Sequence, residues 1–301
     1  MSLELLTACP VCKGTHFSPH LQVTDHSVSH GTFAIVRCEK CSFLFTNPRP
    51  DEAQIGAYYD DDSYLSHHDN PDSTLAKVYN AVRNFAVREK INLLNKYDGN
   101  PQKKVLDIGC ATGFFLSAVK QKNWETWGTE PDADARQIAL KKNAGNVLPS
   151  VFDPALRDNH FTSVTMWHVL EHVHRLDETL NWIHQHLDSK GALFIAVPNP
   201  ESYDAAAYGE YWAAYDVPRH LYHFTRSTMA KLLQHYGFSI VGTRCMLFDA
   251  YYVSLLSTKY KYGKNKPAEA LVRGTLSNLK GYGTALHNAN TSSLIYIVQK
   301  K

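Results

Sequence analysis

Apolar and polar positions alternate in regular blocks from residue 101 onward, and the blocks predict strands and helices in turn. Apolar residues run together in short stretches that predict buried strands, at 104–108, 124–129, 161–167, 192–197, 238–243 and 293–299. Between them, apolar residues return every three or four positions and predict helices, at 114–122, 133–142, 177–187 and 227–236. Such alternation predicts an α/β fold with a mostly parallel, doubly wound sheet.

Two segments outside this alternation predict helices of their own. Apolar residues from Ser73 to Lys96 follow a helical stripe that ends at Asp98-Gly99-Asn100-Pro101. We therefore expect a linker and helical cap over residues 51–100, followed by the main domain at 101–301. Residues 245–290 lie between the last two predicted strands and indicate a helical insertion.

The cysteines of the first fifty residues form two closely spaced pairs. Cys9 with Cys12 and Cys38 with Cys41 each make a Cys-x-x-Cys turn. Two such turns that face each other supply the four thiolates of a tetrahedral zinc site. The pattern predicts a small zinc ribbon over residues 1–50, and the alternatives are a metal-free hairpin or a redox pair.

Composition and charge narrow the class of protein. The chain has 301 residues, of which 44% are hydrophobic and 20% charged, as in soluble globular proteins. The formal net charge of +2 argues against a dedicated nucleic-acid binder. The longest apolar run, Ala192 to Val197, is too short to cross a membrane, and Met1 to Pro10 lacks the pattern of a secretory signal. We expect a cytoplasmic protein with no membrane partner.

The most informative motif follows the first strand of the main domain. It reads Asp107-Ile108-Gly109-Cys110-Ala111-Thr112-Gly113, with glycines where the backbone must pass close to a ligand and open a helix. The carboxylate before the turn would repel a pyrophosphate but suits a ligand with an ammonium and a sulfonium group. Glu130 follows the next strand, where an acid can accept hydrogen bonds from two ribose hydroxyls. The alternative is an ordinary strand–turn–helix with two solvated acids.

With these motifs in this order, residues 103–243 resemble the class I S-adenosylmethionine-dependent methyltransferases. The resemblance implies a Rossmann-like, seven-stranded sheet whose last strand is antiparallel, and S-adenosylmethionine as cofactor. It implies roles for eight residues: Asp107, Gly109, Cys110 and Gly113 at the methionine end, Glu130 at the ribose, Asp132 or the chain beside it at the adenine, and Trp167 and His168 beside the sulfonium. Ala111 replaces the family's middle glycine, and Thr162 replaces an acid often found in the fourth strand.

A second functional interpretation comes from the sequence His168-Val169-Leu170-Glu171-His172. On a helix, this spacing is the inverted zinc-peptidase motif. Because His168 falls at the end of a predicted strand, the two histidines are not expected to share a helical face. The same string is familiar at this position in the methyltransferases that the chain resembles.

Two further histidines are candidates for the chemistry. His220 and His223 lie in a loop after the strand 192–197, at the sheet edge where such folds bind ligands, and His titrates near neutral pH. This loop and the amino-terminal cysteines resemble the sugar C-methyltransferases that act on nucleotide-linked deoxysugars, in which a histidine at the position of His220 is the candidate base. Here Arg219 stands where those enzymes have an acid.

Three classes of function follow from the sequence. The first is methyl transfer to a small molecule, such as a sugar or a secondary metabolite. The second is RNA methylation, for which four lysines interleaved with tyrosines could contact phosphates, namely Lys259, Lys261, Lys264 and Lys266. The simpler interpretation of that run is a solvated, flexible linker that ends at Pro267. The third class is a cofactor-binding protein without catalysis.

Overall fold

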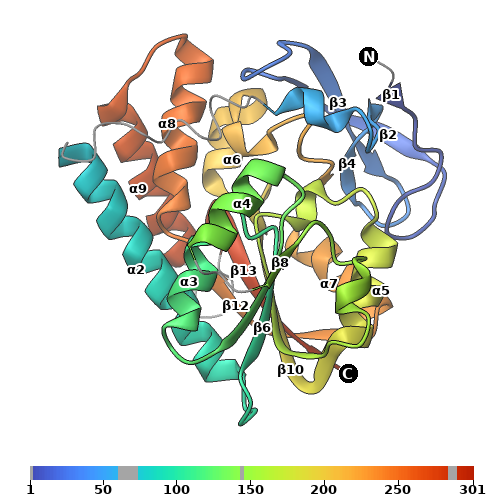
Figure 1. Ribbon diagram of the computed structural model, residues 1–301. Helices are drawn as coiled ribbons and strands as arrows, with labels where there is room; N and C mark the ends of the chain where they lie inside the picture. Colours follow the sequence, from blue (N-terminus) through green and yellow to red (C-terminus); the bar gives the residue numbers. More distant parts are fainter. Residues whose placement is uncertain (1–2, 60–73, 143–145, 284–289) are drawn as a thin grey trace.

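The computed structural model describes residues 3–59, 74–142, 146–283 and 290–301. A large twisted sheet with helices on both faces makes up most of the molecule, and a smaller sheet from the amino-terminal segment lies over one end of it (Figure 1). Within these residues, no helix combines the length and the apolar character needed to span a membrane.

The large sheet has seven strands in the order β12-β13-β10-β9-β6-β7-β8. All neighbouring pairs are parallel except those of β13, which runs antiparallel to both β10 and β12. The strands are β6 (Lys104–Ile108), β7 (Glu125–Thr129), β8 (Asn146–Leu148), β9 (Phe161–Trp167), β10 (Leu187–Pro198), β12 (Phe238–Cys245) and β13 (Ser293–Lys300). The predicted fold class, including seven strands with an antiparallel last strand, is confirmed.

Helices cover both faces of this sheet and bury its apolar side chains. On one face, α2 (Thr74–Tyr97) and α3 (Phe114–Lys120) pack over Val105 and Phe194. On the other face, α5 (Leu176–His186) and α7 (Arg226–His235) pack over residues such as Leu106 and Val164. The short α4 (Ala133–Lys141) follows β7, as the motif pattern predicted.

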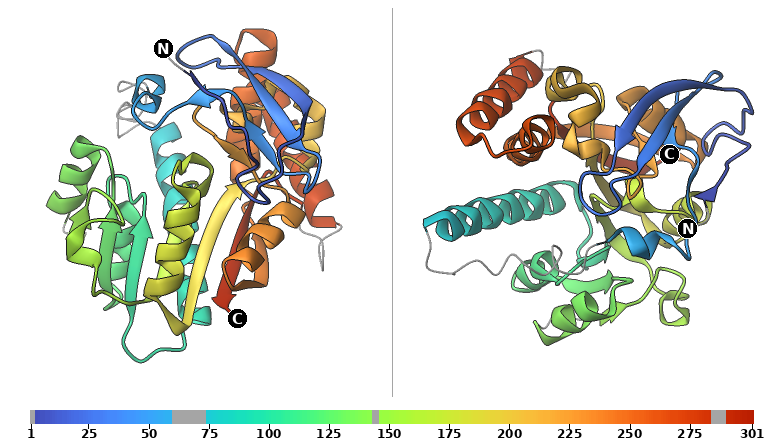
Figure 2. Two further views of the ribbon diagram at one scale, coloured as in Figure 1. Left: turned by 90° about the vertical axis from the view of Figure 1, so that its right-hand side faces the viewer. Right: turned by 90° about the horizontal axis from the view of Figure 1, so that it is seen from above.

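The amino-terminal segment forms two small sheets. β1 (Leu3–Glu4) pairs with β5 (Arg49–Pro50). The other sheet has the order β11-β4-β3-β2, from β2 (Phe17–Thr24), β3 (Thr32–Cys38), β4 (Leu44–Thr46) and β11 (Tyr222–His223). Because β11 comes from the main domain, the amino-terminal sheet, which lies against that domain in Figure 2, is joined to it by hydrogen bonds. Phe43 lies in the same core as Phe224.

The segment between β12 and β13 contains two helices, α8 (Asp249–Tyr262) and α9 (Pro267–Gly283), which pack against each other and against α6 (Tyr203–Tyr208). The interpretation of the lysine run as a flexible linker is wrong, because residues 259–262 belong to α8. Only the few residues between Tyr262 and Pro267 connect the two helices. Part of the predicted linker, residues 60–73, lies outside the described residues.

Candidate cofactor and acceptor site

The turn between β6 and α3 is built for close approach of a ligand. Gly109 and Gly113 have φ of 70° and 71°, the left-handed region that favours glycine. A Cβ added at Gly109 would lie 2.5 Å from Cγ2 of Val169, so no larger residue fits there without movement. Ala111 also has a positive φ, 47°, and its N–H donates to Glu130 Oε2 at 2.9 Å. The Cys110 side chain is buried below the turn and leaves only its backbone for a ligand.

Asp107 is buried near the carboxyl end of β6. Its Oδ1 accepts a hydrogen bond from the Thr165 hydroxyl at 2.6 Å. Burial raises the pKa of Asp107 to about 7, although the Thr165 hydrogen bond and the Lys90 charge oppose the rise. A buried carboxylate held this way would be stabilised by a cationic partner.

Glu130 follows β7 and is oriented by backbone donors. Its two carboxylate oxygens accept from the N–H groups of Ala111 and Asp132, at 2.9 and 3.0 Å. Burial raises its pKa. Since each oxygen keeps a second lone pair, the carboxylate can still accept from vicinal hydroxyls. The carboxylate of Asp132 caps α4 by accepting from the Ala135 N–H at 2.7 Å.

Trp167 ends β9, but a cation already covers its ring. Nζ of Lys90 in α2 lies 4.3 Å from the ring centroid, and the ring packs edge-on against Phe115. The sequence analysis did not single out Lys90. A signal was present, because Lys90 falls on the same helical face as the buried Val87, Ile91 and Leu94.

His168 lies between two acids at the end of β9. Its Nδ1 is 3.3 Å from Glu171 Oε1 and its Nε2 is 3.0 Å from Asp249 Oδ2. Burial alone would lower the pKa of His168, but the two carboxylates raise it to about 10. The ring is therefore a charged group near neutral pH and cannot serve there as a proton acceptor. Asp249, from the start of α8, could not be recognised in the sequence.

The motif from His168 to His172 does not lie on one α-helix. His168 has a positive φ of 58° after the strand, and a single 3-10 turn covers Leu170–His172. Three side chains do come close: Glu171, His172 and His220 offer ligand atoms within 4.8 Å of one another. His168 is not part of this group, so the alternative of a peptidase pair, which the sequence disfavoured, does not form among the described residues.

His172 and His220 present the same kind of nitrogen to the site. Nδ1 of His220 lies 2.9 Å from the Ala214 carbonyl oxygen, and Nδ1 of His172 lies 3.0 Å from that of Arg219. Since a carbonyl only accepts, both Nδ1 atoms carry the proton, and both Nε2 atoms are bare in the neutral rings. The rings meet edge to face at 4.6 Å, and burial lowers the pKa of His172 to about 4.

His223 does not occupy the position that we expected of a catalytic group. It lies in β11, only 4% exposed, and its Nε2 is 3.3 Å from the Thr46 hydroxyl of β4. Burial lowers its pKa well below 6.5. In the structure, His223 is therefore a buried residue that packs between the two sheets.

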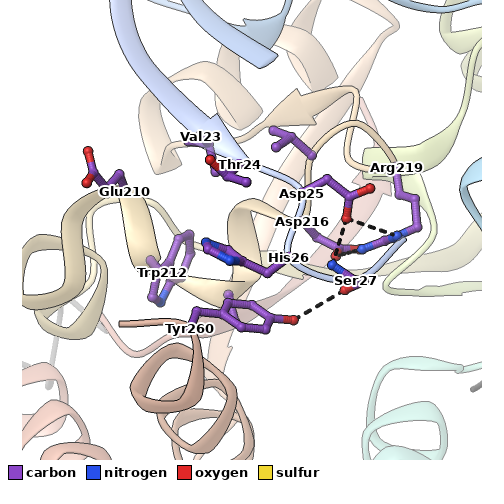
Figure 3. A pocket seen from close by; sticks show the side chains of 12 residues that line it. Val23, Thr24, Asp25, His26, Ser27, Glu210, Trp212, Asp216, Arg219 and Tyr260 are labelled. Atoms are coloured by element: carbon purple, nitrogen blue, oxygen red, sulfur yellow. Dashed lines mark hydrogen bonds and ion pairs between the residues drawn. The ribbon is translucent and has the colours of Figure 1, made fainter. Parts of the chain in front are cut away.

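Arg219 fixes the loop that carries His220. Its guanidinium contacts the carboxylate of Asp216 and donates to the Tyr58 carbonyl oxygen at 2.8 Å, with Asp25 3.7 Å away (Figure 3). These groups come from three parts of the chain. The residue that departs from the family pattern is thus a charged brace between the loop and the amino-terminal sheet.

The four predicted cysteine ligands come together. Sγ of Cys9 lies 3.6 Å from that of Cys41, and Sγ of Cys12 lies 3.5 Å from that of Cys38. A zinc ion about 2.3 Å from each of four tetrahedral sulfurs would separate them by about 3.8 Å, so the spacing fits. In both turns the residue after the second cysteine has a positive φ, 57° at Lys13 and 65° at Ser42.

Comparison with known proteins identifies a family. A family model described as a methyltransferase domain matches residues 79–243, just over half of the chain. An uncharacterized protein of Methanocaldococcus jannaschii is 34% identical over 126 residues, which are 40% of this chain and 54% of that protein. The chain thus spans about half the length of the curated relative that it matches.

Solved structures with similar folds include two methyltransferases. A SAM dependent methyltransferase from Archaeoglobus fulgidus has 21% sequence identity and a TM-score of 0.47, over 73% of this chain and 94% of that chain. The magnesium protoporphyrin IX methyltransferase of Synechocystis PCC 6803 has 14% identity and a TM-score of 0.48, over 77% and 90%. The assignment of a family depends on the match over residues 79–243 and not on these likenesses.

Proposed function

This chain belongs to the methyltransferase domain family, and from that premise we propose that it methylates a small molecule, a sugar or a secondary metabolite, with S-adenosylmethionine as the donor. The resemblance that the motifs of residues 103–243 indicated is the family that the comparison finds. The nature of the acceptor, the base and the zinc site are parts of the proposal.

Bound S-adenosylmethionine supplies an electrophilic methyl group whose thioether leaves without help from an acid. In the proposal, Asp107 binds the ammonium of the donor and Glu130 accepts from its ribose hydroxyls. Two buried carboxylates at one sheet edge, with their oxygens oriented by Thr165 and by backbone N–H groups, support this assignment. In the proposal, Gly109 and Gly113 adopt the positive φ that brings the backbone of the turn to the ligand.

The proton acceptor in the proposal is His220. The observation that carries it is the hydrogen bond from Nδ1 to the Ala214 carbonyl oxygen, which leaves the proton-accepting lone pair on Nε2, 3.8 Å from Asp216 Oδ2. The loop that holds the ring is braced by Arg219 and Asp216, which favours one orientation. His172 has the same arrangement, but burial lowers its pKa to about 4, so it is the second choice.

A small acceptor is favoured over RNA by the surroundings of the lysine run. Tyr260, which would have to stack on a base, is instead stacked on His26 at 4.5 Å, with its hydroxyl 3.3 Å from that of Ser27 (Figure 3). In the proposal, Cys9, Cys12, Cys38 and Cys41 bind a structural zinc ion that holds the amino-terminal sheet. That sheet in turn pairs with β11, which begins two residues after His220.

The test is transfer of an isotopically labelled methyl group to a panel of sugars, phenols and amines, followed by mass spectrometry. His220→Ala should lower turnover of a hydroxyl or carbon acceptor by about 10²–10⁴-fold and leave donor affinity unchanged. His235→Ala, an exposed histidine of α7, is the matched control. Wild-type turnover in the His220 variant would rule out this base, and methylation of RNA alone would overturn the acceptor class.

A further inference from the structure

The outer face of α9 is apolar although it faces solvent. Five of its large apolar side chains are between 38% and 65% exposed, namely Leu271, Val272, Leu276, Leu279 and Tyr282. At 100° per residue these positions fall within one stripe that contains no charged residue. We call these five residues the α9 face. Single exposed leucines are common, whereas a whole exposed apolar stripe marks an interaction surface.

The side of α9 that faces the protein carries small residues, whereas a surface helix normally buries its large apolar residues. The residues that α9 buries are small: Ala270, Gly274, Ser277 and Gly281. A Cβ at Gly274 would lie 2.8 Å from the Tyr251 ring, so α9 packs closely against α8 through its small residues. The large apolar side chains therefore contribute nothing to the core, and the helix is inverted relative to a normal surface helix.

The hairpin formed by α8 and α9 has an excess of positive charge. Residues 249–283 contain six basic residues and two acidic ones, while the whole chain has an excess of only two positive charges. Four of the six are the lysine-rich turn, which we define as Lys259, Lys261, Lys264 and Lys266. The acid Glu269 is paired with Arg273 and Lys266, and the acid Asp249 is paired with His168. The hairpin therefore presents a positive excess next to an apolar stripe.

Contrary to the expectation from the sequence of no membrane partner, we propose that α8 and α9 attach this protein to the surface of an anionic lipid bilayer. The α9 face would enter the boundary between headgroups and acyl chains, and the lysine-rich turn would contact the acidic headgroups. This proposal does not rest on the proposed function, because it uses no residue of the site. The hairpin lies at the upper left of the molecule in Figure 1, and the side chains of the α9 face are exposed among the described residues.

Two other partners fit the surface less well. RNA would satisfy the lysines but offers no apolar group to cover leucines such as Leu271 and Leu279. A second copy of the chain would cover the α9 face but would bring a second lysine-rich turn and no free acid to the same hairpin. Only an amphiphile with negative charge matches both the apolar α9 face and the positive lysine-rich turn.

The experiment is cosedimentation of the full-length protein with vesicles, either of phosphatidylcholine alone or with added phosphatidylglycerol. We expect binding to the anionic vesicles only, and its loss at high salt because screening weakens the lysine contacts. Leu271→Ser with Leu279→Ser should lower the partition coefficient at least tenfold. Lys261→Gln with Lys264→Gln should lower it by about fivefold per lysine.

Matched controls use residues of similar exposure away from the hairpin. Leu140→Ser on α4, where the side chain is 47% exposed, and Lys122→Gln with Lys141→Gln should bind vesicles like the wild type. Far-ultraviolet circular dichroism and donor binding show that each variant is folded. Absence of binding to anionic vesicles would overturn the proposal, as would equal losses in the control variants. Dimerisation that the leucine changes abolish, without vesicle binding, would assign the face to a second copy.

Discussion

Replacement of Asp107 by asparagine separates the charge of this side chain from its shape. Asparagine keeps an oxygen that can accept from Thr165, so the local hydrogen bond survives. The charge-assisted contact with the ammonium of the donor is lost. We expect the affinity for S-adenosylmethionine to fall by one to two orders of magnitude, about 1.4–2.8 kcal/mol.

The pH dependence of donor affinity is a second test of the role of the Asp107 charge. With a pKa of about 7 in the free protein, Asp107 must lose a proton before it can pair with the cation. If only the ionised form binds, affinity should be roughly fivefold higher at pH 7 than at pH 6. The Asp107→Asn variant should show no such rise.

Stability should change in the opposite direction. Because the folded protein raises the pKa of Asp107 from 3.8 to about 7, its ionisation disfavours folding by on the order of 4 kcal/mol. This penalty is absent below pH 4, grows as the pH rises and is complete above pH 7. Asp107→Asn should therefore resist urea better than the wild type at pH 8 and equally at pH 4.

Isothermal titration calorimetry and urea unfolding monitored by fluorescence measure both effects. Thr126→Val, a change at another buried polar residue of the sheet, controls for general effects of substitution. Unchanged donor affinity in Asp107→Asn at pH 7 would refute the role of this carboxylate. Loss of affinity together with loss of stability would instead indicate that the change damages the fold.

Three shorter predictions test other parts of the site. Cys9→Ser with Cys12→Ser should remove one zinc per chain, as measured by metal analysis. Because the loosened amino-terminal sheet would no longer hold β11, methyl transfer should slow while donor affinity is retained. A wild-type protein without zinc would contradict this prediction. Gly109→Ala should abolish donor binding in calorimetry because its methyl group would lie 2.5 Å from Val169, and normal affinity would show that the turn adjusts. His220→Ala should slow methyl transfer to a hydroxyl acceptor more than His172→Ala does, and the reverse order would exclude His220 as the base.

Much of the large sheet could be predicted because its strands are buried on both faces and read as apolar runs. β8 could not, because it has three residues and buries only Val147. The turn after β6 was predictable for a different reason: its glycines and acids are needed at fixed spacing along the chain. The cysteine turns share this property, since each keeps its ligands within four residues.

The parts of the site that escaped prediction depend on contacts between distant segments. Asp249 pairs with His168 across 81 residues, and no local pattern links the two. His223 looked equivalent to His220 in the loop, but pairing of β11 with β4 directs its ring toward Thr46. In the sequence, Arg219 stood out only because it replaces an acid of the enzymes that the loop resembles. In the structure it forms ion pairs with Asp216 and Asp25 and so fixes the loop.

Direct measurement of ligand binding to the wild-type protein tests the central claim. Calorimetry should show one molecule of S-adenosylmethionine or S-adenosylhomocysteine bound per chain, and no binding of NAD under the same conditions, because Asp107 at the start of the turn repels a pyrophosphate. Glu130→Ala should abolish the heat of binding. Binding of NAD in place of S-adenosylmethionine, or no binding of either S-adenosyl ligand, would contradict the account.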